Sequence, residues 1–239
     1  SSLDILTTLY FHVMRVNPDA PQAPERDRFV LSKGHCTPAL YSTMAQRGFF
    51  PLEELKQFRR IEGHMSGHAE MRHVKGVDMS TGSLGQGISA AVGMALAGKA
   101  DGRDYRVYAL LGDGEIEEGQ VWEAAMAAAK YRLDNLCAVV DVNGLQIDGT
   151  NDEVMGVGDM MAKYEAFGFA CVKVDGHDIG AVVEAVNTPH PGKPLFVCCE
   201  THKGHGVSFM EDQVGWHGKA PNKEQYEQAM KELGVSDNG

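Results

Sequence analysis

The chain has 239 residues, of which 43% are hydrophobic and 23% charged, a composition typical of a globular protein with a sizeable core. Its 22 basic and 33 acidic side chains give a formal net charge of -11, which argues against a general nucleic-acid binder or a binder of anionic membranes. No apolar run approaches the roughly 18 residues of a membrane span, and no signal-peptide pattern opens the chain. Five cysteines, an odd number, indicate reduced thiols in a cytoplasmic protein.

The start of the chain predicts a helix. Apolar residues from Leu6 to Val13 recur at helical spacing, and Ser1 or Ser2 is suited to be the N-cap. Because this pattern begins at once and lacks an initiator Met, we expect that a preceding segment is missing from the sequence. No linker or repeat divides the rest, so residues 1–239 are expected to form a single domain.

Helical and strand patterns divide the chain into two parts. Up to about residue 100, helices are expected at 37–47, 51–58 and 85–97, and a loop rich in Gly and His lies between the second and the third. From about residue 105 short apolar runs alternate with helical patterns. Strands are expected at 106–111, 136–140, 170–174 and 195–199, and helices at 115–131, 159–167, 181–187 and 223–233. This alternation predicts an α/β fold, a doubly wound and mostly parallel sheet with helices on both faces.

Polar clusters follow each of the four expected strands, at 112–118, 141–148, 175–178 and 201–205. Ligands of parallel sheets bind beyond the carboxyl ends of the strands, so these clusters predict a site along one edge of the sheet. Glu115, Glu117 and Glu123, in the helix expected after the first of these strands, are interpreted as surface residues that suit the helix dipole.

A cysteine and histidine cluster has the composition of a zinc site. Cys198 and Cys199 lie shortly before His202 and His205. Neighbouring residues on a strand point to opposite faces, so the two cysteines are not expected to share one metal.

The most informative pattern joins two of the strand ends. Gly112-Asp113-Gly114 follows one expected strand, and Asn143 follows the next, with 28 residues between Gly114 and Asn143. Either motif alone is a common turn. Adjacent parallel strands lie about 4.8 Å apart, so the pair brings two hard oxygen ligands to one point. This arrangement predicts a divalent-metal site for Mg²⁺, Ca²⁺ or Mn²⁺, in which a diphosphate can complete the coordination.

The same pair is the signature of thiamine-diphosphate-binding proteins. The chain resembles the N-terminal, diphosphate-binding (PP-type) half of transketolases over nearly its whole length. The resemblance rests on several motifs in the family's order: LSKGH at 31–35, GHAE at 67–70, TGSLGQG at 81–87, GDG at 112–114, residues 141–149, KGHG at 203–206 and WHGK at 216–219.

The resemblance implies a metal site and a substrate channel. Asp113, Asn143 and the main-chain carbonyl of Leu145 would bind the divalent metal. Histidines at three matching positions would line the channel, bind ketose hydroxyls and transfer protons as catalytic residues: His35, His68 and His217. An imidazole suits this task because its pKa near 6.5 lets it donate or accept a proton at neutral pH.

The resemblance also implies a set of contacts to thiamine diphosphate. The main chain of Gly114 and of residues 82–84 would approach the cofactor, Ile147 would pack on it, and Lys203 would face its diphosphate. Glu118 matches an acidic residue at the interface between the two cofactor-binding halves. The full set of implied cofactor-binding residues is His35, Gly82, Ser83, Leu84, Gly114, Glu118, Asn143, Ile147, Lys203 and His217.

In this family a second, pyrimidine-binding domain supplies the glutamate that activates the cofactor. Transketolases that carry both domains on one chain are far longer than 239 residues. We therefore expect the N-terminal subunit of a split transketolase, which is inactive without its C-terminal partner and forms a two-plus-two heterotetramer with it. It would transfer a two-carbon ketol unit from a ketose phosphate to an aldose phosphate. An upstream Ser-Gly-His segment with one further substrate-binding histidine is expected before residue 1.

Two other functions remain open from the sequence. The α subunit of a 2-oxo acid dehydrogenase shares the GDG and Asn metal site and the split architecture, but is not expected to carry the GHAE and WHGK motifs. A non-catalytic paralogue that only binds the cofactor or regulates a partner is the second alternative, and the full set of metal and histidine positions argues against it.

Overall fold

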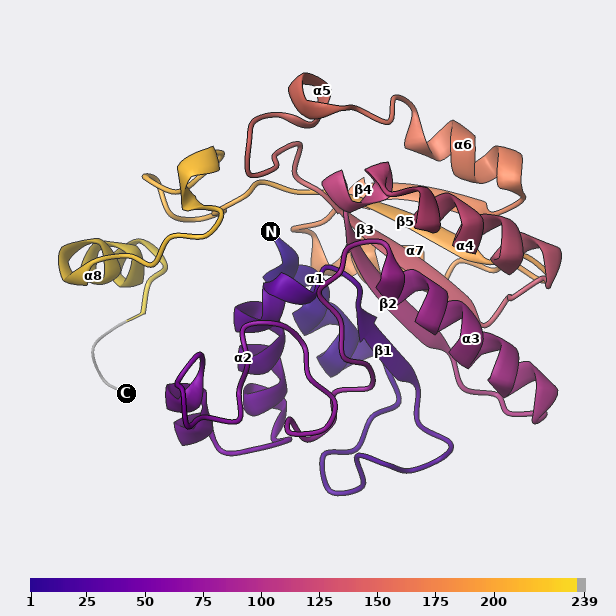
Figure 1. Ribbon diagram of the computed structural model, residues 1–239, viewed down its shortest axis with the longest axis horizontal. Helices are drawn as coiled ribbons and strands as arrows, with labels where there is room; N and C mark the ends of the chain where they lie inside the picture. The colour runs from indigo at the N-terminus through magenta and orange to yellow at the C-terminus, as the bar shows by residue number, and fades with distance from the viewer. Residues whose placement is uncertain (236–239) are drawn as a thin grey trace.

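The computed structural model describes residues 1–235, which contain a five-stranded, entirely parallel sheet (Figure 1). The strands lie in the order β1-β2-β3-β5-β4. Their bounds are Arg28–Leu31 for β1, Val107–Gly112 for β2, Leu136–Val142 for β3, Ala170–Asp175 for β4 and Leu195–Glu200 for β5. The doubly wound α/β fold expected from the sequence is therefore confirmed.

Eight α-helices accompany the sheet in the described part of the chain. They are α1 (Ser2–Thr8), α2 (Thr37–Arg47), α3 (Gln86–Ala100), α4 (Gly119–Lys130), α5 (Asn151–Val154), α6 (Met160–Phe167), α7 (Ile179–Val186) and α8 (Lys223–Glu232). A π-helical turn continues α1, and short 3₁₀ turns occur at Gly34–Cys36, Leu52–Gln57, Gly114–Glu117 and Val214–Trp216. Among residues 1–235, none of the helices combines the length and the apolar character needed to cross a bilayer.

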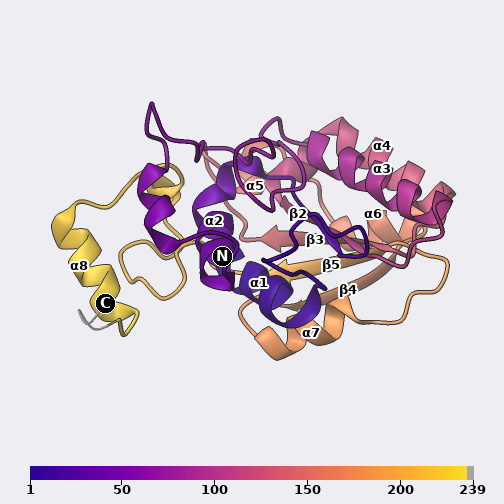
Figure 2. The same cartoon turned by 90° about the horizontal axis from the view of Figure 1, so that it is seen from below.

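Helices cover both faces of the sheet and enclose two hydrophobic cores (Figure 2). Helices α1, α2 and α7 bury their apolar side chains on one face, and α3, α4 and α6 bury theirs on the other. Successive strand residues divide between the two cores, because side chains alternate along a strand. Cys199 belongs to the first core and Cys198 to the second, so the two thiols point to opposite faces, as expected.

Three local expectations differ from the structure. Strand β1 was not anticipated, because its apolar run is only the three residues after Arg28; β1 pairs with β2, and its carboxyl end leads into the 31–35 motif. The helix expected from residue 115 begins at Gly119, since residues 114–117 form a 3₁₀ turn and Glu118 is extended. The helix expected at 51–58 is likewise a 3₁₀ turn, Leu52–Gln57.

Close backbone packing between the 31–35 and 81–87 motifs gives a testable stability effect. A Cβ atom added at Gly34 would lie 2.5 Å from the carbonyl carbon of Thr81, and backbone atoms cannot rotate away. We expect Gly34→Ala to lower the free energy of unfolding by about 1–3 kcal/mol or more, as other overpacking substitutions do. The matched control is Gly93→Ala in α3, where the added Cβ meets nothing within 4 Å. It should stabilise the chain by about 0.5–1 kcal/mol, because Ala is the better helix former. Urea unfolding measures the free energy of unfolding of both variants. Equal effects of the two substitutions would contradict the close contact between Gly34 and Thr81.

Candidate functional site

The ends of β2 and β3 bring Asp113 and Asn143 to the same edge of the sheet. Gly112 pairs with Asp141 in the strand register, so the residues that follow each strand leave the sheet side by side. The Asp113 carboxylate ties the two loops together, since Oδ1 accepts a hydrogen bond from Gly114 N (2.9 Å) and Oδ2 accepts one from Gly144 N (2.6 Å). The loops that carry Asp113 and Asn143 therefore meet, as their spacing predicts.

Oxygen atoms of the loop after β3 offer further ligands for a hard cation. Asn143 Oδ1 accepts a hydrogen bond from Leu145 N (3.2 Å), and the Leu145 carbonyl accepts one from Lys203 Nζ (3.3 Å). The Lys203 ammonium shows that this carbonyl already attracts a cation. No group of three or more His, Cys, Asp or Glu side chains in the described part of the chain could hold a metal ion alone. A carboxylate, an amide and a carbonyl instead form a set of hard oxygen donors that fits a divalent cation sharing phosphate ligands.

Two of the three expected histidines lie together beside Lys203. The rings of His35 and His217 are 5.3 Å apart between centroids, and Lys203 Nζ donates to His217 Nδ1 at 2.9 Å. Burial and the surrounding positive groups lower the pKa of His35 to about 4. Burial, and then the charge of Lys203, also lowers the pKa of His217. Both rings are therefore neutral near pH 7, and Lys203 beside them is the cation that suits an anionic ligand.

His68 lies on a separate loop that is fastened to the same corner. Tyr41 donates from its hydroxyl to the His68 carbonyl (3.1 Å), while the His68 residue as a whole is exposed. The His68 ring lies so close to Gly82 that a Cβ there would be 2.8 Å from His68 Cδ2, and Gly82 has a φ of +152°. Only glycine permits this approach, so the ring lies directly against the 82–84 segment.

Main-chain hydrogen bonds join three of the sequence motifs into one unit. Ala69 N donates to Gly34 O (3.1 Å), and Thr81 N donates to Ala69 O (3.0 Å). The Thr81 hydroxyl also donates to Leu31 O (2.6 Å). The motifs at 31–35, 67–70 and 81–87 are thus neighbours in space, which the sequence order alone does not reveal.

The remaining expected residues surround this corner. Gly114 faces Gln146, whose side chain would meet an added Cβ at 2.9 Å. Ser83 is exposed and Gly82 and Leu84 are half-buried. Ile147 is 68% exposed, which is unusual for an isoleucine and leaves its side chain free to pack on a ligand. Glu118 is exposed between β2 and α4, next to Gly85, and is therefore accessible to another chain.

A buried ion pair beneath the site was missed from the sequence. Lys33 and Asp141 are 5% and 0% exposed and form a salt bridge, and the Asp141 carboxylate also accepts hydrogen bonds from the hydroxyls of Ser1, Ser2 and Thr201. Burial alone would raise the pKa of Asp141, but Lys33 and the hydroxyl donors hold it well below its usual range. The signal available was a carboxylate at the end of an otherwise apolar strand.

Glu115 is a residue whose position was predicted wrongly from the sequence. It was interpreted as a surface residue on a helix, but it is 2% exposed and precedes α4. Burial raises the pKa of its carboxyl, and hydrogen bonds from Ser32, Gly85 and Gly112 act in the opposite direction. A local acidic pattern at a helix start does not distinguish a solvated carboxylate from one that faces inward, because that depends on the neighbouring loops.

A hollow of about 980 Å³ borders the loop after β3, on its β4 and β5 side. Asn143, Gly144 and Leu145 line it together with three histidines and several acidic side chains. The rings of His177 and His205 are stacked at 3.8 Å between centroids, and His177 Nδ1 lies 2.6 Å from the carboxylate of Asp4.

Comparisons with known proteins agree with this geometry. The family described as "Transketolase, thiamine diphosphate binding domain" matches residues 1–238. The chain belongs to the transketolase family. It is 44% identical to an apulose-4-phosphate transketolase subunit of Phocaeicola vulgatus, covering 98% of this chain and 83% of that protein. It is also 44% identical to the 6-deoxy-6-sulfo-D-fructose transketolase subunit SqwG of a Clostridium species, covering 98% and 86%.

Solved transketolases share this fold but are longer. The transketolase of Pichia stipitis in complex with sedoheptulose 7-phosphate superposes with a TM-score of 0.91 at 31% identity, over 99% of this chain and 41% of that one. The transketolase of Leishmania mexicana gives 0.90 at 29% identity, over 97% and 37%. The chain therefore corresponds to one part of the solved transketolases and spans well under half of their length.

The environment of His35 predicts an unusual titration. NMR of ring-labelled histidines should show His35 titrating near pH 4, because burial and the charges of Lys33 and Lys203 disfavour its protonated form. In the unfolded chain a histidine titrates near 6.5. The unfolded state then binds more protons between these values, so His35 favours folding fully above pH 6.5, and that contribution falls as the pH drops toward 4. Lys203→Met should raise the pKa of His35; a wild-type value at or above 6.5 would contradict the packing.

Proposed function

We propose that this chain is the thiamine-diphosphate-binding subunit of a two-chain transketolase. The enzyme transfers a two-carbon ketol unit from a ketose phosphate to an aldose phosphate. The observation that supports this most strongly is the convergence of Asp113, Asn143 and Leu145 with Lys203 on one edge of the sheet, beside His35 and His217. The two relatives with 44% identity, whose names describe them as transketolase subunits, support the two-chain arrangement.

The metal is proposed to be Mg²⁺, with Ca²⁺ or Mn²⁺ able to replace it. Asp113, the side-chain oxygen of Asn143 and the carbonyl of Leu145 would hold it, and the diphosphate would supply further oxygens. Since Lys203 Nζ donates to the Leu145 carbonyl and lies beside His217, it is placed to turn toward the diphosphate. Burial lowers the pKa of Lys203, and the nearby carboxylate of Asp113 opposes that effect.

The cofactor would lie between the 82–84 segment and Ile147, with the main chain of Gly114 at its diphosphate. Gly82 and Gly114 have no side chain to obstruct this approach. Thiamine diphosphate supplies the reactive carbon and the electron sink that make carbon–carbon cleavage feasible. Residues of this chain would bind the cofactor, orient it and exclude water from its surroundings.

Histidines 35, 68 and 217 would read the sugar hydroxyls. With a pKa near 4, His35 is neutral at physiological pH and can accept a hydrogen bond from a hydroxyl or donate one through its ring N–H. Lys203 donates to His217 Nδ1, which places the ring proton of neutral His217 on Nε2. In these roles the neutral imidazoles would transfer protons at the hydroxyl oxygens. Such general acid–base catalysis raises the reaction rate on the order of 10²-fold or more.

We propose that a second chain supplies the pyrimidine-binding domain and the glutamate that activates the cofactor. The exposed carboxylate of Glu118, next to Gly85, is placed to meet that chain. A two-plus-two heterotetramer satisfies this requirement. Residues 1–239 would form one domain of it, and the five free cysteines suit a reducing, cytoplasmic environment.

The reaction class is tested by supplying the assembled enzyme with thiamine diphosphate, Mg²⁺ and either of two donors. With a ketose phosphate and an aldose phosphate acceptor, the product should be two carbons longer than the acceptor. Decarboxylation of a 2-oxo acid in place of ketol transfer would assign the chain to the α subunit of a 2-oxo acid dehydrogenase instead.

A further inference from the structure

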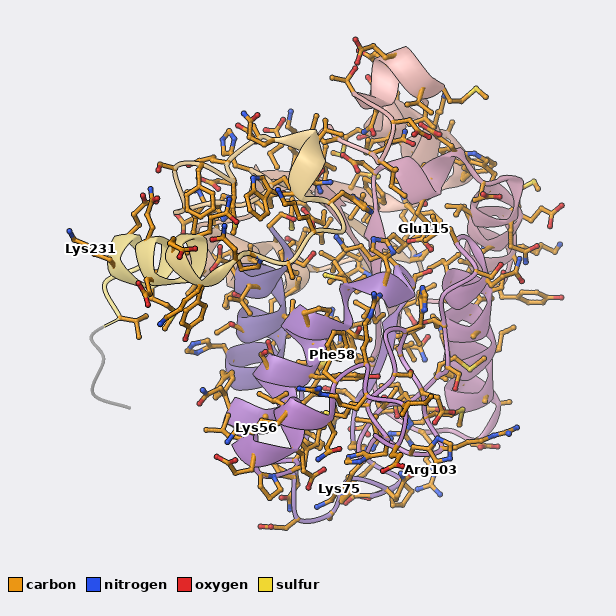
Figure 3. The ribbon with its side chains drawn as sticks, turned by 60° about the vertical axis from the view of Figure 1, so that its left-hand side comes forward. Lys56, Phe58, Lys75, Arg103, Glu115 and Lys231 are labelled. Atoms are coloured by element: carbon orange, nitrogen blue, oxygen red, sulfur yellow. The ribbon has the colours of Figure 1, made fainter. Side chains whose placement is uncertain are left out.

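We propose that Glu115 is a positioning residue that fixes the three loops forming the cofactor side of the site, an inference that rests on the proposed function. The side chain is 2% exposed and lies inside the molecule, whereas Lys56 and Lys231 lie at its periphery (Figure 3). It has no place among the metal ligands or the histidines. Its importance comes from what its two oxygens hold.

The three groups that donate to Glu115 belong to three different segments, of which one is the β2 end that carries Glu115 itself. Oε1 accepts hydrogen bonds from the Ser32 hydroxyl (2.5 Å) and from Gly85 N (2.9 Å). Oε2 accepts one from Gly112 N (3.1 Å). Ser32 lies in the 31–35 motif with His35 (the histidine loop). Gly85 directly follows residues 82–84, whose main chain would approach the cofactor (the cofactor loop). Gly112 ends β2 and directly precedes Asp113 (the metal loop). One carboxylate therefore joins the histidine loop, the cofactor loop and the metal loop.

The segments around Glu115 are closely packed, so they have little room to rearrange. A Cβ added at Gly87, in the first turn of α3, would lie 2.6 Å from Ser32 Cα. Gly85 has a φ of +81°, a conformation that glycine adopts readily, and its N–H donates to Glu115. Since the loops meet backbone to backbone, a change at their common acceptor should move the loops themselves rather than a flexible side chain.

An ionised carboxylate is the group that can satisfy all three donors. It has two acceptor oxygens and no donor. In Glu115→Gln, one oxygen becomes an amide NH₂ group, which would face either Gly112 N–H or the pair formed by Ser32 and Gly85. Two donors then face each other in a buried place, and the buried N–H without an acceptor costs about 1–3 kcal/mol.

The test uses the assembled two-chain enzyme and separates cofactor binding from turnover. In Glu115→Gln, the Kd for thiamine diphosphate at fixed Mg²⁺ should rise by about 10–100-fold, the range seen when residues that orient ligands are lost. At saturating cofactor, kcat should fall by less than about fivefold, since the reacting groups are still present. Glu123→Gln, an exposed carboxylate on α4, is the matched control and should leave both values unchanged.

Ser32→Ala provides a second variant in case Glu115→Gln does not fold. It removes one donor but leaves both main-chain hydrogen bonds, so the cofactor Kd should rise by about 3–10-fold. Wild-type cofactor affinity in either folded variant would overturn the inference, as would a loss of stability without a change in Kd. If the wild-type assembly itself does not bind thiamine diphosphate, the proposed function fails, which is a distinguishable result.

Discussion

Replacing Asp113 with Asn should weaken the Mg²⁺-dependent binding of thiamine diphosphate by more than about 100-fold. Changing residues that merely orient metal ligands costs about 10–100-fold, and a direct carboxylate ligand should cost more. The Asp113 carboxylate accepts hydrogen bonds from Gly114 N and Gly144 N. The substitution places an amide NH₂ opposite one of these two main-chain donors. The effect is measured by titrating the assembled enzyme with the cofactor at several Mg²⁺ concentrations and recording the binding by calorimetry.

The control for this variant is Asp152→Asn. Asp152 is exposed on α5, so the change in net charge is the same while no main-chain contact of the metal loop is lost. Its cofactor affinity should equal that of the wild type. If Asp113→Asn instead binds cofactor as tightly as the control does, the metal site has been placed on the wrong residues.

The second large effect is expected on stability. Lys33→Met leaves the Asp141 carboxylate buried without its cation, and breaking a buried pair in this way costs about 3–5 kcal/mol. The double substitution Lys33→Met with Asp141→Asn removes both charges. The amide oxygen can accept from the hydroxyls of Ser1 and Ser2, and the amide NH₂ can donate to the Thr201 hydroxyl. The double variant should recover most of the loss. Free energies of unfolding in urea measure both variants.

An exposed ion pair on the same sheet provides the comparison. Lys173 and Glu200 form a salt bridge at 2.6 Å, but both side chains are more than half exposed. Lys173→Met should therefore change the free energy of unfolding by less than about 1 kcal/mol. A loss of similar size for Lys33→Met and Lys173→Met would mean that burial does not govern the Lys33 pair.

The pH dependence of the buried pair follows from the lowered pKa of Asp141. The folded state keeps this carboxyl ionised at pH values where the unfolded chain, with a pKa near 3.9, takes up a proton. The stabilisation is therefore fully present above pH 3.9 and is lost as the pH falls further. The double variant should be less sensitive to acid over that range.

Much of the fold could be predicted because the strands after residue 105 are apolar runs, interrupted only by Lys173 in β4, that end at polar clusters. The same clusters located the edge of the sheet where Asp113 and Asn143 meet, since parallel strands share one carboxyl edge. Strand β1 lacked such a signal: it is four residues long and starts at a charged residue.

The contacts between motifs could not be predicted from the sequence. The position of Ala69 N against Gly34 O, and the convergence of Ser32 and Gly85 on Glu115, depend on how loops distant in the chain pack together. A glutamate shortly before a helix has the same local signature whether it is solvated or buried. The structure is therefore needed to find the buried positions of Glu115 and Asp141, while the meeting of the loops that carry Asp113 and Asn143 could be predicted from their spacing.

The most direct test of the account is turnover of xylulose 5-phosphate with ribose 5-phosphate, thiamine diphosphate and Mg²⁺. The assay is run with this chain alone, with the proposed C-terminal partner subunit alone, and with the two mixed. Other ketose phosphates are substituted if the mixture binds the cofactor but does not use this donor. Ketol transfer is expected only in the mixture, because this chain would hold the metal and diphosphate while its partner would activate the cofactor. Full turnover by this chain alone would contradict the account.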